Sequence, residues 1–168
     1  MWIVVPSGDL TVETVLSLKR TGEVPVELHE GTLRIPPPHF WWRQKTATTV
    51  TRHFRQLGRA ALPGIGIRLG ERSYRIPDVV VLRAGVAFDQ DALLQEPEKV
   101  DMVVEVVEPA SADEDRLVKP HVYARAGIPN YWIVDRGVVS VNALRADRYV
   151  PLREVPLEEL LAGGGGLG

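Results

Sequence analysis

The stretch DMVVEVVEPASADEDRLVKP, residues 101–120, passes from an apolar run into an acidic segment. Its first seven residues are apolar on both predicted faces, which is typical of a central strand in a sheet. Glu105 nevertheless lies in the middle of that run. An ionised carboxylate in an apolar interior costs several kcal/mol unless a cation or a hydrogen-bond donor meets it. The candidates are a lysine, an arginine, a ring of donors or a metal ion.

The acidic segment that follows predicts a helix packing back on this strand. Ser111 with Glu114 fits a capping box, and the helix is expected to run to Ala126, just before a glycine. Pro120 interrupts the pattern. Either the helix kinks there, or its first turn is irregular and regular helix starts at Pro120.

Lys119 is the cation that this helix can aim at Glu105. It lies four residues after Asp115 and four before Tyr123, so the three share one side of the helix. Beside carboxylates and a metal, this lysine would stay charged and could orient or help to deprotonate a metal-bound water. The alternative is a surface pair with Asp115, worth about 0.3–0.5 kcal/mol.

Asp78 is a second carboxylate on a strand that should be buried, between Ile76-Pro77 and the run VVVL at 79–82. The two acids converge if their strands are neighbours, and they repel unless a cation lies between them. Mg²⁺ or Mn²⁺ is the natural occupant of such an oxygen site. The alternative is that each acid pairs separately with an arginine or accepts from a backbone donor.

Apolar spacing and turn residues predict the other elements. They are a helix at 10–19, a hairpin turning at Glu30-Gly31, a helix at 42–61, strands at 64–70, 73–82, 130–135 and 138–144, and a last helix at 157–162. Because helices alternate with strands, we expect a single α/β domain with a central mixed β-sheet flanked by helices. It should span 1–162, followed by a flexible Gly-rich tail at 163–168.

Composition narrows the class of protein. The 168 residues include no cysteine, which excludes disulfides and thiolate metal sites. No apolar run approaches the roughly 20 residues of a membrane span, and the start lacks the basic region of a signal peptide. We therefore expect a cytoplasmic protein without a membrane segment. The net charge of −2 argues mildly against a protein that coats nucleic acid non-specifically.

Charge is unevenly distributed along the chain. Residues 31–70 contain seven Lys and Arg but no Asp or Glu, whereas 86–115 contain ten acidic residues and one lysine. Lys45, Arg52 and Arg59 recur at steps of seven on the 42–61 helix, opposite its apolar stripe. They are expected to be exposed, available to a polyanion or simply to water.

Five strings resemble the Uma family of restriction-endonuclease-like proteins, long classed as a domain of unknown function. They are VELHEGTLRIPPP, YRIPDVVVL, VVEVVEPAS, EDRLVK and VYARAGIPNYWIVD, between about Val26 and Asp135. The family belongs to the PD-(D/E)xK nuclease superfamily. The resemblance implies that fold, a mixed sheet flanked by helices, and hydrolysis of phosphodiester bonds.

The resemblance also implies a catalytic set. Asp78 matches the Asp of the PD motif and Glu105 matches the second acid. The superfamily usually places its lysine two positions after that acid, where this chain has Val107. The family displaces the lysine to the following helix, and Lys119 matches that position.

Further positions follow from the same resemblance. The main-chain carbonyl of Val106 is implied as a metal ligand, and Glu27 as an outer metal ligand or a supporting group. Asp115 and Tyr123 match supporting positions. Two residues depart from the family: Glu108 replaces a small hydroxyl residue, and Trp42 stands where a histidine is common, unless His39 substitutes for it.

Three interpretations follow. The first is a Mg²⁺- or Mn²⁺-dependent DNA endonuclease whose basic helix contacts phosphates and which needs a homodimer to cut both strands. The second is a catalytically inactive nuclease-fold module for binding or interaction. The third, a small-molecule phosphate enzyme, would need a Gly-rich loop opening a helix, and GIGIRLG precedes a strand instead. Tyr131 and Trp132 could stack on bases, but their apolar strand favours core packing.

Overall fold

The structure, a computed structural model, describes residues 3–5, 8–18 and 25–163. The predicted tail lies outside this range except for its first residue, Gly163, and the last residue of the predicted 10–19 helix lies outside it too. None of the helices described combines the length and apolarity of a membrane span.

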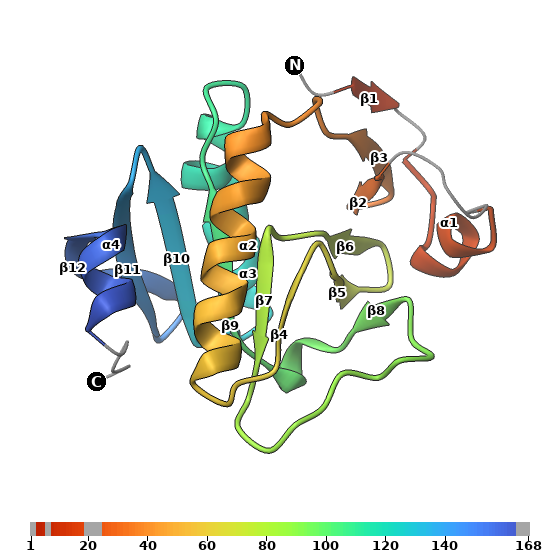
Figure 1. Cartoon of the computed structure of the whole chain (residues 1–168). Coiled ribbons are helices and arrows are strands. Elements are labelled where there is room, and N and C mark those ends of the chain that lie inside the picture. Colours follow the sequence, from red (N-terminus) through yellow and green to blue (C-terminus); the bar gives the residue numbers. More distant parts are fainter. Residues whose placement is uncertain (1–2, 6–7, 19–24, 164–168) are drawn as a thin grey trace.

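The chain forms two six-stranded sheets with helices packed around them (Figure 1). In chain order the elements are β1 (Ile3–Val5), α1 (Val12–Leu18), β2 (Glu27–His29), β3 (Thr32–Ile35), α2 (Trp41–Gln56), β4 (Ala61–Pro63), β5 (Gly66–Gly70), β6 (Ser73–Arg75), β7 (Val79–Leu82), β8 (Leu94–Gln95), the 3₁₀-helix η1 (Pro97–Lys99), β9 (Val100–Val106), the π-helix η2 (Glu114–Val118), α3 (Lys119–Arg125), β10 (Asn130–Asp135), β11 (Val138–Arg145), β12 (Arg148–Pro156) and α4 (Leu157–Ala162).

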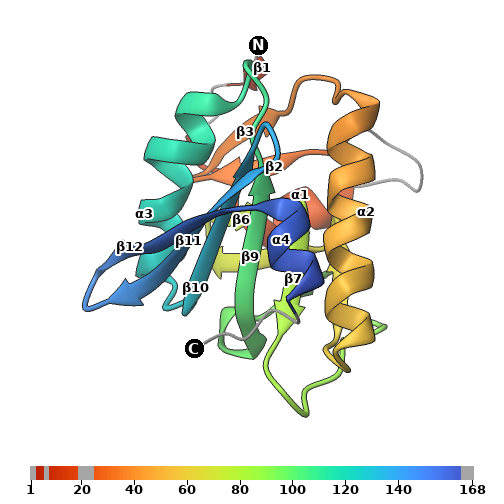
Figure 2. The ribbon, with the colours of Figure 1, turned by 60° about the vertical axis from the view of Figure 1, so that its left-hand side comes forward.

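The predicted α/β architecture is confirmed. A central sheet has the order β12-β11-β10-β9-β7-β4, in which β9 pairs parallel with β10 and antiparallel with β7. Helices α2 and α4 cover one face and α3 covers the other (Figure 2). A second sheet, the N-terminal sheet, has the order β1-β3-β2-β6-β5-β8 and was not foreseen. The hairpin at Glu30-Gly31 forms its centre, with positive φ at both turn residues.

The core lies on both faces of β9. On one side, Val50 and Phe54 of α2 pack against Val104 and Trp132. On the other side, Tyr123 of α3 packs with residues that include Val103 and Tyr131. Because Tyr131 and Trp132 are each only 1% exposed, the prediction of core packing for them is confirmed.

The predicted strand at 73–82 is wrong as a single element. It divides into β6, in the N-terminal sheet, and β7, in the central sheet, with Ile76-Pro77-Asp78 as the crossover. Pro77 has no N–H to donate, so the strand ladder ends there. The crossover places Asp78 at the point where the two sheets meet.

The predicted helix at 42–61 is too long. Helix α2 ends at Gln56, and Gly58 follows with φ of 74°. The Gly58 amide donates to the Arg55 carbonyl at 3.0 Å and the Arg59 amide to the Phe54 carbonyl at 2.9 Å, which is a Schellman ending. Arg59 therefore lies beyond the helix, and the prediction that places it on the exposed helical face is wrong.

The segment after β9 follows the second of the two predicted alternatives. The irregular first part is the π-helix η2, and regular helix begins at Lys119 with Pro120 in its first turn. The predicted capping box is wrong, because the Ser111 hydroxyl donates to Asp115 Oδ2 at 2.5 Å. Glu114 instead pairs with arginines of the N-terminal sheet.

Strand β12 was missed because its sequence contains Pro151 and Pro156. It is an edge strand of the central sheet, pairing only with β11 among the strands described, and proline is tolerated at an edge. The predicted strands at 130–135 and 138–144 and the helix at 157–162 match β10, β11 and α4.

Candidate active site

Asp78 and Glu105 come together because β7 and β9 are neighbours. Val79 pairs with Val104, so Asp78 lies beside the end of β9. The Val106 amide donates to Asp78 Oδ2 at 2.7 Å, tying the carboxylate to the central sheet. Glu105 is completely buried, and the Asp78 side chain is 11% exposed. The convergence expected from the sequence is therefore present.

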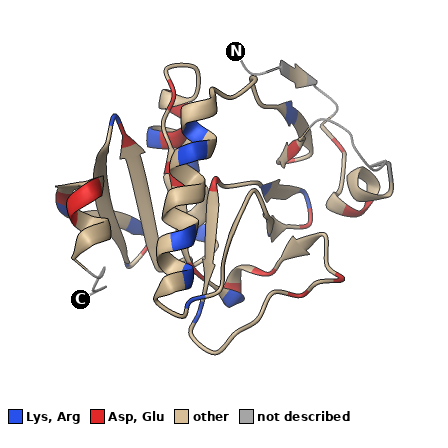
Figure 3. Cartoon of the chain, viewed as in Figure 1, with Lys and Arg blue, Asp and Glu red and all other residues tan. Residues whose placement is uncertain are grey.

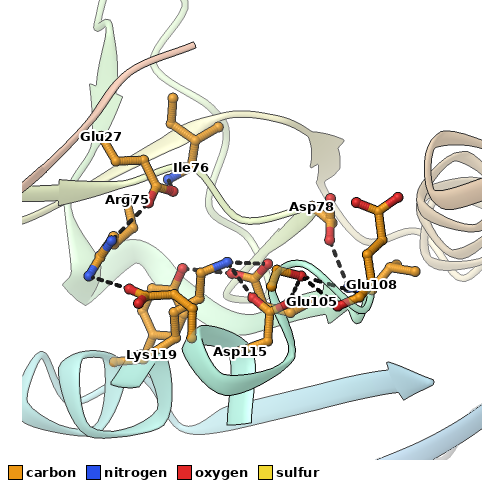
Figure 4. A network of polar contacts seen from close by, with 12 residues as sticks. Glu27, Arg75, Ile76, Asp78, Glu105, Glu108, Asp115 and Lys119 are labelled. Atoms are coloured by element: carbon orange, nitrogen blue, oxygen red, sulfur yellow. Dashed lines mark hydrogen bonds and ion pairs between the residues drawn. The ribbon is translucent and has the colours of Figure 1, made fainter. Parts of the chain in front are cut away.

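Lys119 reaches Glu105 from α3. Its Nζ lies 2.8 Å from Glu105 Oε2 and 2.7 Å from Asp115 Oδ1, and the Tyr123 hydroxyl donates to Glu105 Oε1 at 2.9 Å. Lys119, Asp115 and Tyr123 thus share one side of the helical segment as predicted (Figure 4 shows Lys119 and Asp115). Lys119 is only 1% exposed, which contradicts the alternative of a surface pair.

Arg43 was not foreseen, and its guanidinium lies between the two acids. Nε contacts Asp78 Oδ1 at 2.7 Å, Nη2 lies 3.8 Å from Glu105 Oε2, and Nη1 lies 3.2 Å from Glu108 Oε2. The sequence contains a signal for it. The apolar stripe of α2, continued back from Val50 through Ala47, arrives at Arg43.

Glu108 compensates for Arg43 and fixes the start of α2. Its Oε1 accepts from the Phe40 amide at 2.8 Å, and its Oε2 lies 3.2 Å from His39 Nδ1. Glu108, which departs from the family pattern, is therefore paired with Arg43 in the structure. Trp42 is partly buried against the core cluster, and His39 lies at the site.

We call these six side chains the surplus cluster: Asp78, Glu105, Glu108, Asp115, Arg43 and Lys119. When all are ionised, four carboxylates face two cations, so two negative charges are in excess. Burial raises the pKa of Glu105 to about 8; Lys119 opposes this rise, whereas Asp115 and Asp78 add to it. Burial alone would lower the pKa of Lys119, but Glu105 and Asp115 outweigh it and raise that pKa, so the ammonium stays charged.

A second charged group, which we call the balanced quartet, lies beside it and consists of the buried Glu27 and Arg75 and the half-buried Glu114 and Arg34 (Figure 4 shows the first two). Arg75 contacts Glu27 Oε2 and Glu114 Oε1, each at 2.9 Å, and Arg34 contacts Glu114 Oε1 at 2.6 Å. The Ile76 amide donates to Glu27 Oε1 at 2.9 Å. Two acids meet two arginines, so no charge is left over.

A cavity of about 520 Å³ opens beside both groups. Glu27, Arg43, Asp78 and Lys119 line it, together with Gln44 and other residues of α2 and of the crossover. The buried carboxylates are thus next to a space large enough for a ligand.

Comparisons with known proteins show the family and the fold of the chain. The model of the Uma2 family, described as "Putative restriction endonuclease", matches residues 12–165. The chain belongs to the Uma2 family. No curated protein matches it.

The fold of this Uma2 family member is shared with solved structures. One is the crystal structure of a "putative nuclease belonging to DUF820" from Anabaena variabilis, with a TM-score of 0.61 and 15% identity. The match covers 93% of this chain and 99% of that chain. The restriction-endonuclease-like fold implied by the sequence is thereby confirmed.

Families with this fold generally use divalent metal ions, and the donors of the Uma2 site fit such an ion. Among the described residues, no three His, Cys, Asp or Glu side chains gather as a metal site. Asp78 and Glu105 supply two carboxylates, and Mg²⁺ commonly takes one or two carboxylates with water completing its shell. With all four carboxylates of the surplus cluster ionised, their excess of two negative charges matches a divalent cation. Arg43 would have to withdraw from between the acids.

The basic residues predicted to contact nucleic acid separate into two groups. Lys45 and Arg52 are exposed on α2, without a carboxylate partner in the part of the chain that is described. Arg59 is ion-paired with Asp101 and donates to the Leu82 carbonyl at 2.9 Å. Its availability to a ligand is therefore lower than that of the other two.

Proposed function

We propose that this Uma2 family member is a divalent-metal-dependent DNA endonuclease that hydrolyses phosphodiester bonds. The observation that supports it most is the surplus cluster. Asp78, from the crossover before β7, Glu105 of the neighbouring β9 and the buried Lys119 share one site beside a cavity, where four carboxylates share only two cationic side chains, Arg43 and Lys119. Membership of the family supports the same reaction class.

In this proposal Asp78, Glu105 and the main-chain carbonyl of Val106 hold Mg²⁺ or Mn²⁺. The bound ion would contact the scissile phosphate and lower the pKa of the attacking water. Lys119 keeps its positive charge between Glu105 and Asp115, where an ammonium can orient that water or offset developing negative charge.

The neighbours of these residues position them. Tyr123 and Asp115 hold Glu105 and Lys119 through their polar contacts. Glu27 is ion-paired with Arg75 and accepts a hydrogen bond from the Ile76 amide, so it holds the crossover that carries Asp78. In this proposal it acts as an outer metal ligand or as a supporting group.

DNA is the substrate that the basic side of α2 suits. Lys45 and Arg52 would contact phosphates, and Arg59 would contribute when it leaves Asp101. Cutting both strands of a duplex requires two such sites, which a homodimer would supply.

Arg43 supports a second candidate, a nuclease-fold binding module without turnover. A guanidinium already lies where a metal would bind, and it contacts Asp78 at 2.7 Å. In that case Mn²⁺ and Mg²⁺ would bind weakly or not at all, or would bind without any cleavage of DNA.

Titration calorimetry with Mn²⁺ and Mg²⁺, beside nicking of supercoiled plasmid, tests the proposal. Wild-type protein should bind metal and nick DNA. Asp78→Asn and Glu105→Gln should lose both, whereas Lys119→Met should lose nicking. Glu154→Gln, at an exposed position of β12, is the matched control and should behave as wild type. Metal binding without nicking, or no metal binding at all, would contradict the proposal and favour the binding module.

A further inference from the structure

Two large aromatic side chains stand in solvent at the start of α2. Trp41 is 72% exposed and Phe40 is 58% exposed. Exposed aromatic area of this size next to a cavity is typical of a binding surface rather than of packing. The buried Tyr131 and Trp132, by contrast, have no free ring face to offer a ligand.

The position of these rings is fixed relative to the surplus cluster. The Phe40 amide donates to Glu108 Oε1 at 2.8 Å, and Phe40 stacks on Trp42 with ring centroids 6.4 Å apart and planes inclined by 12°. Arg43, two residues beyond Trp41, contacts Asp78. The backbone that carries both rings is therefore tied to Glu108 and Asp78 of the surplus cluster.

The exposed side of α2 continues this surface along the cavity. Gln44 and Thr48 are exposed and also line the cavity, so they join the two. Lys45 holds its Nζ 5.7 Å from the centre of the Trp41 ring, and Arg52 follows two turns further on. The helix contains no Asp or Glu, and its basic residues are visible along it in Figure 3.

We propose that Phe40 and Trp41 form a stacking platform for an unpaired base, and that the substrate is single-stranded DNA or DNA with unpaired bases at the cleavage point. The inference rests on the proposed function and names its substrate class. Aromatic rings interleaved with cations bind single strands, because every base has a stacking face and every nucleotide has a phosphate. In a continuous duplex the base faces are already stacked on one another and are closed to Trp41.

Charge argues against a second copy of the chain as the occupant of this surface. A two-fold contact through the same patch would bring Lys45 and Arg52 of one copy close to those of the other. Like charges placed face to face disfavour association. The same cations favour a polyanion.

Fluorescence anisotropy tests the platform without turnover, using labelled oligothymidine and a blunt hairpin duplex in buffer with EDTA. Wild-type protein should bind the oligothymidine more tightly than the duplex. Trp41→Ala should weaken oligothymidine binding about tenfold, the scale of one lost stacking contact, and leave duplex binding unchanged. Trp41→Phe should restore most of it. Leu93→Ala, at another exposed apolar residue (65%), is the matched control.

Two results would overturn the platform. One is equal binding of both nucleic acids with no effect of Trp41→Ala. The other is a dimer in sedimentation that Trp41→Ala dissociates, which would make the patch a contact between copies. Neither result touches plasmid nicking that depends on Asp78 and Glu105, so the nuclease proposal would stand. The opposite outcome is also possible to observe: oligothymidine binding that depends on Trp41, with no nicking in the presence of any metal. That outcome would support the stacking platform and contradict the nuclease proposal.

Discussion

The surplus cluster and the balanced quartet lie side by side, are both largely withdrawn from solvent, and differ in how their charges are matched. In the quartet each acid meets an arginine, and the charges cancel. In the surplus cluster four acids share Arg43 and Lys119, which leaves two negative charges over when all four acids are ionised. Burial alone therefore does not mark a functional acid in this protein. In the nuclease proposal the candidate catalytic acids are instead distinguished by sharing too few cations, an arrangement from which a fold gains no stability.

The largest difference between the two groups should appear when a cation is removed from the quartet. Arg75→Leu leaves Glu27 and Glu114 buried beside each other with only Arg34 nearby. Breaking a buried pair in this way costs about 3–5 kcal/mol of unfolding free energy. Urea denaturation measures it. Arg116→Leu, which breaks an exposed pair with Asp135, should cost less than about 1 kcal/mol. A similar loss in both variants would mean that the quartet is not stabilising.

The second difference is in pH dependence. The pKa of Glu105 is about 8 in the folded protein against 4.5 for an ordinary glutamate, so only the folded state keeps its proton between these values. Its contribution to stability is complete below the unfolded value and is lost as pH rises through 8. The slope of unfolding free energy should approach −1.4 kcal/mol per pH unit, about the limit for one proton.

Denaturation across this pH range, with wild type and Glu105→Gln side by side, checks the slope. The variant should be nearly flat. The quartet offers the contrast, since Arg75 has a raised pKa and stays charged throughout. An unchanged slope in Glu105→Gln would assign the proton to another group.

A third difference concerns Arg43, the cation between the two candidate metal-binding acids of the surplus cluster. Arg43→Met leaves Asp78, Glu105 and Glu108 with more negative charge and clears the space between the first two acids. We expect Mn²⁺ to bind about tenfold more tightly, a gain of about 1.4 kcal/mol. Calorimetry against wild type measures it. Weaker binding would show that Arg43 supports the metal site instead of competing with it.

The smallest effect is expected for Asp78→Asn. The amide oxygen can still accept from the Val106 amide, and the change removes one of the excess charges. Unfolding free energy should change by less than about 1 kcal/mol, although nicking is lost. A loss comparable to that of Arg75→Leu would place Asp78 among the structural residues and remove the distinction between the two groups.

The acids and the lysine of the candidate site could be predicted from the sequence, but the arginines that pair with acids in the two groups could not. Glu105 and Asp78 stand out because a carboxylate in an apolar strand is anomalous by itself, and Lys119 follows from helical spacing. Arg43 and Asp78 are 35 residues apart, and Arg75 meets Glu27 across 48, so only tertiary packing pairs them. The seven-residue spacing predicted that Arg59 lies on the same helical face as Lys45. This is wrong, because α2 ends at Gln56 and Gly58 turns the chain away from the helix.

For the fold, too, local features could be predicted from the sequence and long-range pairing could not. Periodicity located α2, β9 and the hairpins, since each depends on neighbouring residues. The division of 73–82 between two sheets and the edge strand β12 depend on which strand lies alongside, and local sequence does not specify that. The resemblance to the family, and not the spacing of residues, identified the restriction-endonuclease-like fold.

The amide of Val106 has an unusual acceptor, the side chain of Asp78 in place of a backbone carbonyl. In a ¹⁵N-correlated NMR spectrum, the chemical shift of the Val106 amide therefore reports on the state of the Asp78 carboxylate. Protonating Asp78, coordinating an ion with it or moving Arg43 away from it would each shift the Val106 peak, because each changes the acceptor of this amide. In ¹⁵N-labelled protein, the strand thus provides a signal of occupancy that needs neither a substrate nor turnover.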